Sequence, residues 1–268
     1  MPTLARDDIT YHYEDDGPRD APVILLLAGM FSDSASWYPL VEPLTAAHRV
    51  IRPDNRTTGR TTPRDAPCSV TGMAEDAAAL LAALDLTGVH VVGHSMGGLQ
   101  GMELTGLAPE RLASLTILAS APVRSPRIAG LFDNLARVRA APEGEEMWLR
   151  ALFPWLYAPA FFEDPARTEA ALAASRAYPY AQDLASMKHQ LEALKGFRPT
   201  VRTTEITVPT QAVLADEDIL ISKAPAAKAL ATIPGVTLLD LPDAGHSLHW
   251  DQPAAVAQII TDFVAAHS

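Results

Sequence analysis

The chain has 268 residues, of which 48% are hydrophobic and 20% are charged, enough to bury the core of a globular domain. Its formal net charge of −11 argues against a nucleic-acid partner and against an anionic membrane surface. The single cysteine, Cys68, excludes an internal disulfide.

The sequence carries no targeting or membrane-spanning pattern. Its first residues lack the apolar core of a signal peptide. The longest aliphatic run, residues 23–31, is far shorter than the about 20 residues that span a bilayer. We therefore expect a cytoplasmic location and no membrane partner.

Short runs of β-branched and aliphatic residues recur along the chain and predict strands. In chain order, they cover residues 9–13, 23–27, 48–52, 89–92, 115–118, 208–214 and 236–241. Several are apolar without alternation, as in parallel strands covered on both faces. Between them, residues 73–88 and 252–266 carry helical apolar stripes, the first ending at a predicted C-cap, Gly88. This alternation predicts an open α/β sheet that binds ligands at the carboxyl ends of its strands.

The strand signal is lost across residues 122–204, which are rich in alanine, arginine and aromatic residues. Within this stretch, residues 147–162 and 169–194 are typical of helices, although prolines interrupt them. We interpret residues 122–204 as a helical cap inserted into a core domain made of residues 1–121 and 205–268.

The stretch "VVGHSMGGLQ", residues 91–100, contains G-x-S-x-G directly after an apolar strand and before a helical segment. Glycines on both sides of Ser95 allow a sharp turn that strains the serine and projects its hydroxyl into a cleft. We predict Ser95 as a nucleophile, with the N–H of Met96 facing a developing oxyanion. The alternative is a glycine-rich turn whose serine only caps a helix.

A serine hydroxyl needs a base to act as a nucleophile, and the base needs an orienting acid. Of the eight histidines, His246 follows the last predicted strand and precedes the last helix, at the same sheet edge as Ser95. We predict His246 as the base. His249 is the competing residue, but a packing or substrate-facing role suits it better.

Three adjacent acidic residues, Asp216, Glu217 and Asp218, follow the penultimate predicted strand. A carboxylate on this loop can reach the far nitrogen of His246. Asp218 is the predicted acid because it lies deepest in the loop and apolar residues follow it. Asp216 and Glu217 stay open as alternatives.

The chain order serine, acid, histidine, together with G-x-S-x-G, resembles the α/β-hydrolase family over nearly the whole sequence. The segment 215–218 matches the family's G-x-x-D motif with alanine for glycine, and "GHSLHWDQP" matches its G-H-x-x-x-x-x-x-P segment. The resemblance implies a mostly parallel central sheet flanked by helices, with an inserted helical cap. It also supports Asp218 and His246.

Two further segments resemble family features with one change each. The loop "LLLAGMFSDSASW" corresponds to the H-G-x oxyanion loop, with Ala28 in place of the histidine, and implies a second oxyanion N–H from Met30. The turn "DNRTTGRTT" resembles D-x-R-G-x-G-x-S, with Thr57 where glycine is usual, and we interpret it as structural.

The resemblance implies acyl transfer to water. A serine at the elbow excludes the family's haloalkane dehalogenases and epoxide hydrolases, which use aspartate there. The spacing and the cap composition look most like 3-oxoadipate enol-lactonases and small esterases, so we predict hydrolysis of a small carboxylic ester or lactone. Alternatives on the same triad are carbon–carbon cleavage of β-diketones and the perhydrolase chemistry of cofactor-free haloperoxidases. A third possibility is a binding protein without turnover.

Aromatic residues are expected to line the pocket for this small-molecule substrate, although most cap aromatics are expected to form the cap's own core. We predict Trp37, His249, Trp148 and Trp155 as substrate-facing. A substrate carboxylate would need a cap arginine, and the candidates are Arg124, Arg127, Arg137, Arg139, Arg150, Arg167 and Arg176. The sequence lacks H-E-x-x-H, C-x-x-C and phosphate-binding glycine motifs, so we expect no metal and no cofactor. It predicts no oligomeric state.

Overall fold

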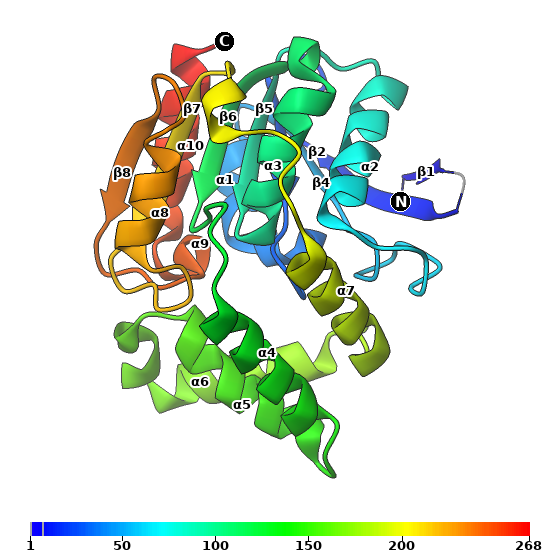
Figure 1. Cartoon of the computed structure of the whole chain (residues 1–268), viewed down its shortest axis with the longest axis vertical. Helices are drawn as coiled ribbons and strands as arrows, with labels where there is room; N and C mark the ends of the chain where they lie inside the picture. The colour runs from blue at the N-terminus through cyan, green and yellow to red at the C-terminus, as the bar shows by residue number, and fades with distance from the viewer. Residues whose placement is uncertain (1, 7) are drawn as a thin grey trace.

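The computed structural model of the chain describes residues 2–6 and 8–268 and has a central sheet of eight strands (Figure 1). The strands are β1 (Thr3–Ala5), β2 (Thr10–Asp16), β3 (Val23–Leu27), β4 (Arg49–Pro53), β5 (Val89–His94), β6 (Leu112–Leu118), β7 (Thr210–Ala215) and β8 (Thr237–Leu241). Their order across the sheet is β1-β2-β4-β3-β5-β6-β7-β8. The pairs β1–β2 and β2–β4 are antiparallel, and all other pairs are parallel.

Ten α-helices and four short 3-10 helices connect the strands of the described residues. The α-helices are α1 (Tyr38–Thr45), α2 (Val70–Ala83), α3 (Met96–Leu107), α4 (Pro126–Arg139), α5 (Gly144–Leu156), α6 (Pro165–Ala177), α7 (Leu184–Gly196), α8 (Lys223–Leu230), α9 (Leu248–Asp251) and α10 (Pro253–Ala266). The 3-10 helices are η1 (Ser34–Trp37), η2 (Pro109–Arg111), η3 (Pro159–Glu163) and η4 (Thr203–Glu205). No helix of the described chain combines the length and the apolar character needed to cross a bilayer.

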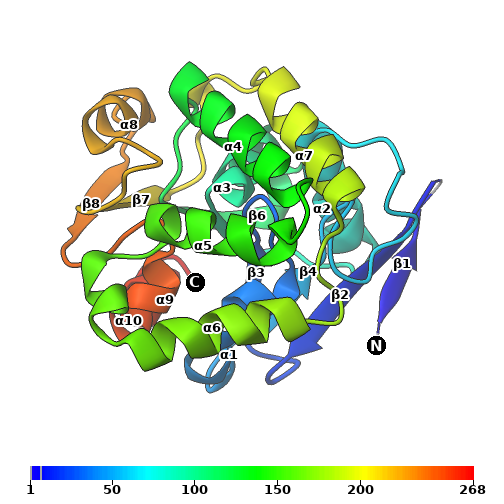
Figure 2. The same ribbon diagram turned by 90° about the horizontal axis from the view of Figure 1, so that it is seen from below.

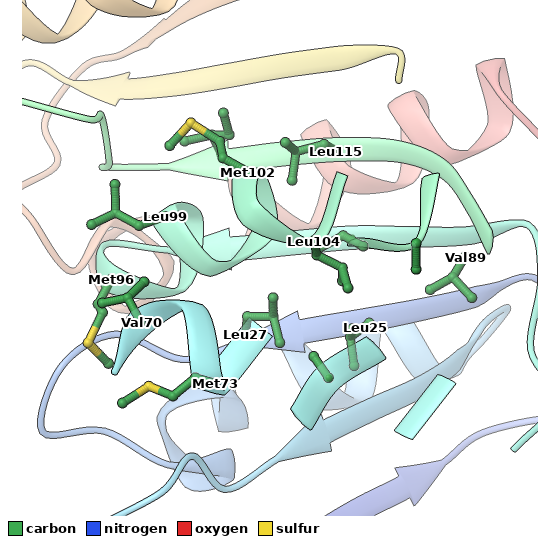
Figure 3. Packing of buried hydrophobic residues seen from close by; sticks show 14 of the residues in the cluster. Leu25, Leu27, Val70, Met73, Val89, Met96, Leu99, Met102, Leu104 and Leu115 are labelled. Carbon is green, nitrogen blue, oxygen red and sulfur yellow. The ribbon is translucent and has the colours of Figure 1, made fainter. Parts of the chain in front are cut away.

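The apolar runs of the central strands are explained by burial on both faces of the sheet. In β3, Leu25 and Leu27 pack in one apolar cluster with residues of α2, α3 and α8. Figure 3 shows Leu25 and Leu27 facing Met73 of α2 and Leu104 of α3. The alternate residues of β3 join the opposite cluster with α1 and α10. Because successive side chains of a strand point to opposite faces, both sets must be apolar.

Helices α4–α7 lie between β6 and β7 in the chain and form a layer below the sheet (Figures 1 and 2). We call these four helices the cap helices. They contribute nearly all of a third apolar cluster, which is separate from the two that cover the sheet. Residues 122–204, all of them described, contain no strand. The separate cluster supports the proposed cap. The limits of the cap at residues 122 and 204 stay a prediction.

The observed architecture confirms the predicted fold class and differs from the prediction in local detail. Each predicted run overlaps a strand, and β1 is a strand that was not predicted. The predicted C-cap at Gly88 is wrong, because α2 already ends at Ala83, where Asp85 adopts a left-handed conformation with φ of 51°. The predicted helix over 169–194 is two helices, since residues 178–183 interrupt it before Asp183 caps α7.

Candidate active site

Ser95 lies at the tight turn between β5 and α3. Its φ of 52° and ψ of −118° are costly for a residue with a side chain. The surrounding glycines make the turn possible, because a Cβ on Gly97 would lie 1.9 Å from the carbonyl oxygen of Leu27. A Cβ on Gly93 would lie 2.2 Å from the carbonyl oxygen of Gly97. The G-x-S-x-G spacing therefore reflects close packing of α3 against β3 and β5.

The structure brings Ser95, His246 and Asp218 together at the carboxyl ends of the strands. The Ser95 Oγ lies 2.9 Å from His246 Nε2, and His246 Nδ1 lies 2.8 Å from Asp218 Oδ2. A carboxylate only accepts hydrogen bonds, so His246 Nδ1 carries the proton and Nε2 accepts from the serine hydroxyl. This is the arrangement in which an imidazole can remove the proton from an alcohol.

Asp218 is fixed in the loop after β7 by backbone donors. Its second oxygen, Oδ1, accepts from the N–H groups of Leu220 at 2.8 Å and Ile221 at 2.9 Å. The two alternative acids lie elsewhere. Asp216 pairs with Lys223 at 2.6 Å, and the side chain of Glu217 is exposed. Of the three adjacent acids, only Asp218 reaches His246.

The loop that carries His246 is tied to the cap segment by Asp251, a residue that the sequence analysis did not single out. Asp251 Oδ2 accepts from the N–H of Gly245 at 2.8 Å and from the N–H of Ala158 at 3.1 Å. Burial raises the pKa of Asp251 above its ordinary value, and these two donors oppose that rise. The only sequence signal was its position inside the matched "GHSLHWDQP" segment.

His94 supports the base from the other side. Its Nε2–H donates to the carbonyl oxygen of His246 at 2.8 Å. Burial, together with the neighbouring His249 and His246, lowers the pKa of His94 well below its ordinary value. His94 is therefore a neutral ring beside the candidate base, and it also lines the pocket.

A cavity of about 780 Å³ opens in front of Ser95 and extends between the core and the cap helices. Trp148 lies in the wall of this cavity, and its predicted substrate-facing role stays a prediction. Trp155 does not line it, and its ring lies under the guanidinium of Arg127 at 5.9 Å. The cavity wall from the cap is mostly apolar and includes Phe132, Leu149, Leu152, Phe153 and Leu156.

Trp37 and His249 also lie outside the cavity wall, so their predicted substrate-facing positions are corrected. Both side chains are buried, and their rings pack against each other with centroids 4.9 Å apart. Trp37 is the last residue of η1. Its ring packs with Leu40 and Leu248 in the apolar cluster between the sheet and helices α1 and α10. A sequence pattern does not show which way such a short helix turns its side chains.

The two predicted oxyanion donors lie in suitable backbone environments. Met96 is the first residue of α3, so its N–H has no acceptor within the helix. Met30 lines the cavity, and the next residue, Phe31, has a φ of 65° and donates its N–H to Gln190 Oε1 of α7 at 2.7 Å. The Ala28 carbonyl accepts from the Asn55 side chain at 3.3 Å. The oxyanion roles of Met30 and Met96 stay a prediction.

The D-x-R-x-x-G turn supports the same loop. The carboxylate of Asp54 accepts from the N–H groups of Ser34 and Arg60, at 2.9 and 2.8 Å. Gly59 has a φ of 54°, and a Cβ there would lie 2.2 Å from Asp54 Oδ2. Thr57 adopts a φ of 73° and accepts from the side chain of Gln182, next to α7. The contacts of this turn are structural, and they connect the core to the cap.

No group of three histidine, cysteine or acidic side chains in the part of the chain that the structure describes could hold a metal ion.

Comparisons with known proteins show the family of the chain. A model described as "Alpha/beta hydrolase family" matches residues 24–259. "Putative carbamate hydrolase RutD" of Variovorax paradoxus is 32% identical, covering 95% of this chain and 96% of the relative. "Rhodomycin D methylesterase DauP" of Streptomyces sp. (strain C5) is also 32% identical, covering 100% and 98%. The crystal structure of the enol-lactonase from Burkholderia xenovorans LB400 has a TM-score of 0.85 at 25% identity, covering 98% and 100%.

Proposed function

The chain belongs to the α/β-hydrolase family, and we propose that it is a serine hydrolase that cleaves a small carboxylic ester or lactone. The observation that carries the proposal is the continuous hydrogen-bonded line from Ser95 through His246 to Asp218. The names of two similar proteins, a methylesterase and an enol-lactonase, support acyl–oxygen cleavage.

The proposed reaction has two halves. Ser95 Oγ attacks the substrate carbonyl carbon while its proton passes to His246 Nε2, and Asp218 stabilises the imidazolium that forms. The N–H groups of Met30 and Met96 stabilise the negative charge on the carbonyl oxygen. His246 then protonates the leaving alkoxide, and an acyl group stays on Ser95. In the second half, His246 takes a proton from water while the water oxygen attacks the acyl carbon. His246 then returns this proton to Ser95 Oγ as the acyl group leaves.

A carbamate is the second candidate substrate, because the relative from Variovorax paradoxus bears the name of a carbamate hydrolase. The same three side chains serve an attack on either carbonyl. Measuring kcat/KM for an ester and for a carbamate of the same alcohol separates the two candidates, since the preferred substrate has the higher value.

The test of the proposal is the hydrolysis of p-nitrophenyl acetate and butyrate. The wild-type protein is expected to turn over these esters, and Ser95→Ala is expected to lose at least about 10³-fold in kcat because the nucleophile is gone. Ser222→Ala is the matched control, since Ser222 is exposed and outside the cavity wall. Equal rates for the wild type and Ser95→Ala would remove Ser95 from the mechanism.

A further inference from the structure

The charged side chains of the cavity wall limit the substrates that the cavity can accept. Within the described part of the wall, Arg139 and Arg176 are the only lysine or arginine residues. Arg139 donates to Glu145 at 2.9 Å and to the carbonyl oxygen of Gln182 at 2.6 Å. Arg176 donates to Glu146 at 2.7 Å. Both guanidinium groups are therefore already paired with a carboxylate.

Among the described residues, three carboxylates line the same cavity, and Asp33 differs from the other two. Glu145 is paired with Arg139, and Asp183 caps α7 and lies 3.9 Å from Arg64. Asp33 is buried at the boundary between the core and the cap, with 6% of its surface exposed. Its carboxylate accepts from two neutral donors at 2.9 Å, the N–H of Ala35 and the hydroxyl of Tyr178.

The rest of the cap wall offers little to solvate a second charge. Its apolar members include Phe132, Leu149, Leu152, Phe153 and Leu156, and Leu220 from the core loop after β7 adds to this apolar surface. A substrate carboxylate in this space would lose its water and would find no uncommitted cation on the described wall. An alkyl or aryl group there would instead gain from leaving water.

We propose that this cavity selects uncharged esters or lactones with an apolar acyl group and rejects those that carry a carboxylate, with Asp33 as a specificity-determining residue. The inference rests on the proposed function, because it names the substrate class of the same site. It argues against the resemblance to enol-lactonases at the level of substrate, since an enol-lactone acid would need a free cation in the cavity.

The selection is expected to depend on pH through the charge of Asp33. Burial, and then the nearby Asp54, raise the pKa of Asp33 to about 6, while the Tyr178 hydroxyl and Arg60 oppose the rise. Tyr38 and Tyr178 are further titratable groups of the cavity wall. Above pH 6 the ionised carboxylate repels an anionic substrate. Below pH 6 it is neutral, so the discrimination weakens.

The test compares methyl hexanoate with monomethyl adipate, which carries a carboxylate in place of the terminal methyl group. At pH 7.5, kcat/KM is expected to favour methyl hexanoate by at least about 100-fold. The ratio of the two kcat/KM values is the readout, because any effect of pH on the catalytic groups that both substrates share cancels in it. At pH 5.5 monomethyl adipate stays mostly ionised, yet the ratio is expected to fall several-fold as Asp33 becomes neutral.

Two variants test the residue assignment. Asp33→Asn is expected to narrow the ratio about tenfold at pH 7.5 and to remove its pH dependence, through faster cleavage of the anionic ester. Glu145→Gln, which leaves Arg139 without its carboxylate, is expected to narrow the ratio in the same direction. Asp262→Asn removes the same charge from an exposed site on α10 and is expected to leave the ratio unchanged.

The outcomes separate the two proposals. Cleavage of both methyl esters with a ratio near one overturns the charge selection and leaves the serine hydrolase intact. A ratio that neither Asp33→Asn nor Glu145→Gln changes overturns the role of the wall charges. No cleavage of the methyl esters or of p-nitrophenyl esters overturns the proposed function itself.

Discussion

At the scale of single residues, the two hydrogen bonds of His246 and the backbone donors to Asp218 define the candidate site. The Asp218 carboxylate holds the imidazole in the tautomer whose Nε2 faces Ser95. Asp218→Asn is expected to lower kcat by about 10⁴-fold, because an amide can donate to Nδ1 and stabilise the wrong tautomer. The measurement is kcat for p-nitrophenyl butyrate, with folding checked by circular dichroism.

Asp216→Asn is the matched control for this change. Asp216 lies two residues before Asp218 and pairs with the partly exposed Lys223, so the loss of its charge is expected to change kcat by less than twofold. The opposite pattern, a large loss of kcat for Asp216→Asn and a small one for Asp218→Asn, would contradict the assignment of Asp218 as the orienting acid.

The sequence predicted the three polar residues of the site because each lies in a local motif at the end of a predicted strand. The predicted substrate-facing positions of Trp37, His249 and Trp155 are wrong, whereas Trp148 lies in the cavity wall. The motif positions depend on chain direction and turn geometry, which neighbouring residues encode. Whether an aromatic ring faces a cavity or a core depends on distant packing partners, and these have no local pattern.

At the scale of elements, apolar runs predicted the central strands well because both faces of the sheet are covered. The three-residue β1 has no such signal, since its residues are exposed or partly exposed. The end of α2 was missed because Asp85, rather than the later Gly88, adopts the left-handed conformation that stops it. Helix limits therefore depend on a cap that the composition alone did not reveal.

At the scale of the whole molecule, buried histidines link stability to pH. Burial is the main cause that lowers the pKa of His90 to about 4, that of His249 to about 3, and that of His94 well below its ordinary value. In the unfolded chain these groups bind protons near pH 6.5. Below that pH the unfolded state gains protons that the folded state does not, so stability is lost as the pH falls.

The expected size of this pH dependence follows from the number of protons that the chain binds on unfolding. Three histidines would give a slope of about 4 kcal/mol per pH unit, at about 1.4 kcal/mol per proton. Asp33 acts in the opposite direction between its unfolded pKa and about 6, since the folded protein then holds the proton. For these four groups together, the expected loss in the free energy of unfolding between pH 6 and pH 5 is about 2–3 kcal/mol.

Urea unfolding at pH 7.5, 6 and 5 measures this loss. His90 lies near the start of β5, at the opposite end of the strand from Ser95, and forms hydrogen bonds with Ser114 and Ser268. His90→Gln is therefore expected to reduce the slope by about one proton, or about 1.4 kcal/mol per pH unit. A free energy of unfolding that stays constant from pH 7.5 to pH 5 would contradict the assignment of neutral buried histidines.

The central claim is that His246 activates the hydroxyl of Ser95, and covalent labelling tests it most directly. The wild-type protein is incubated with a fluorophosphonate, its intact mass is measured, and the modified residue is mapped on proteolytic peptides. We expect one adduct per chain, on Ser95, and labelling slowed by at least about 10³-fold in folded His246→Ala. An adduct on another residue, or equally fast labelling of His246→Ala, would contradict the account.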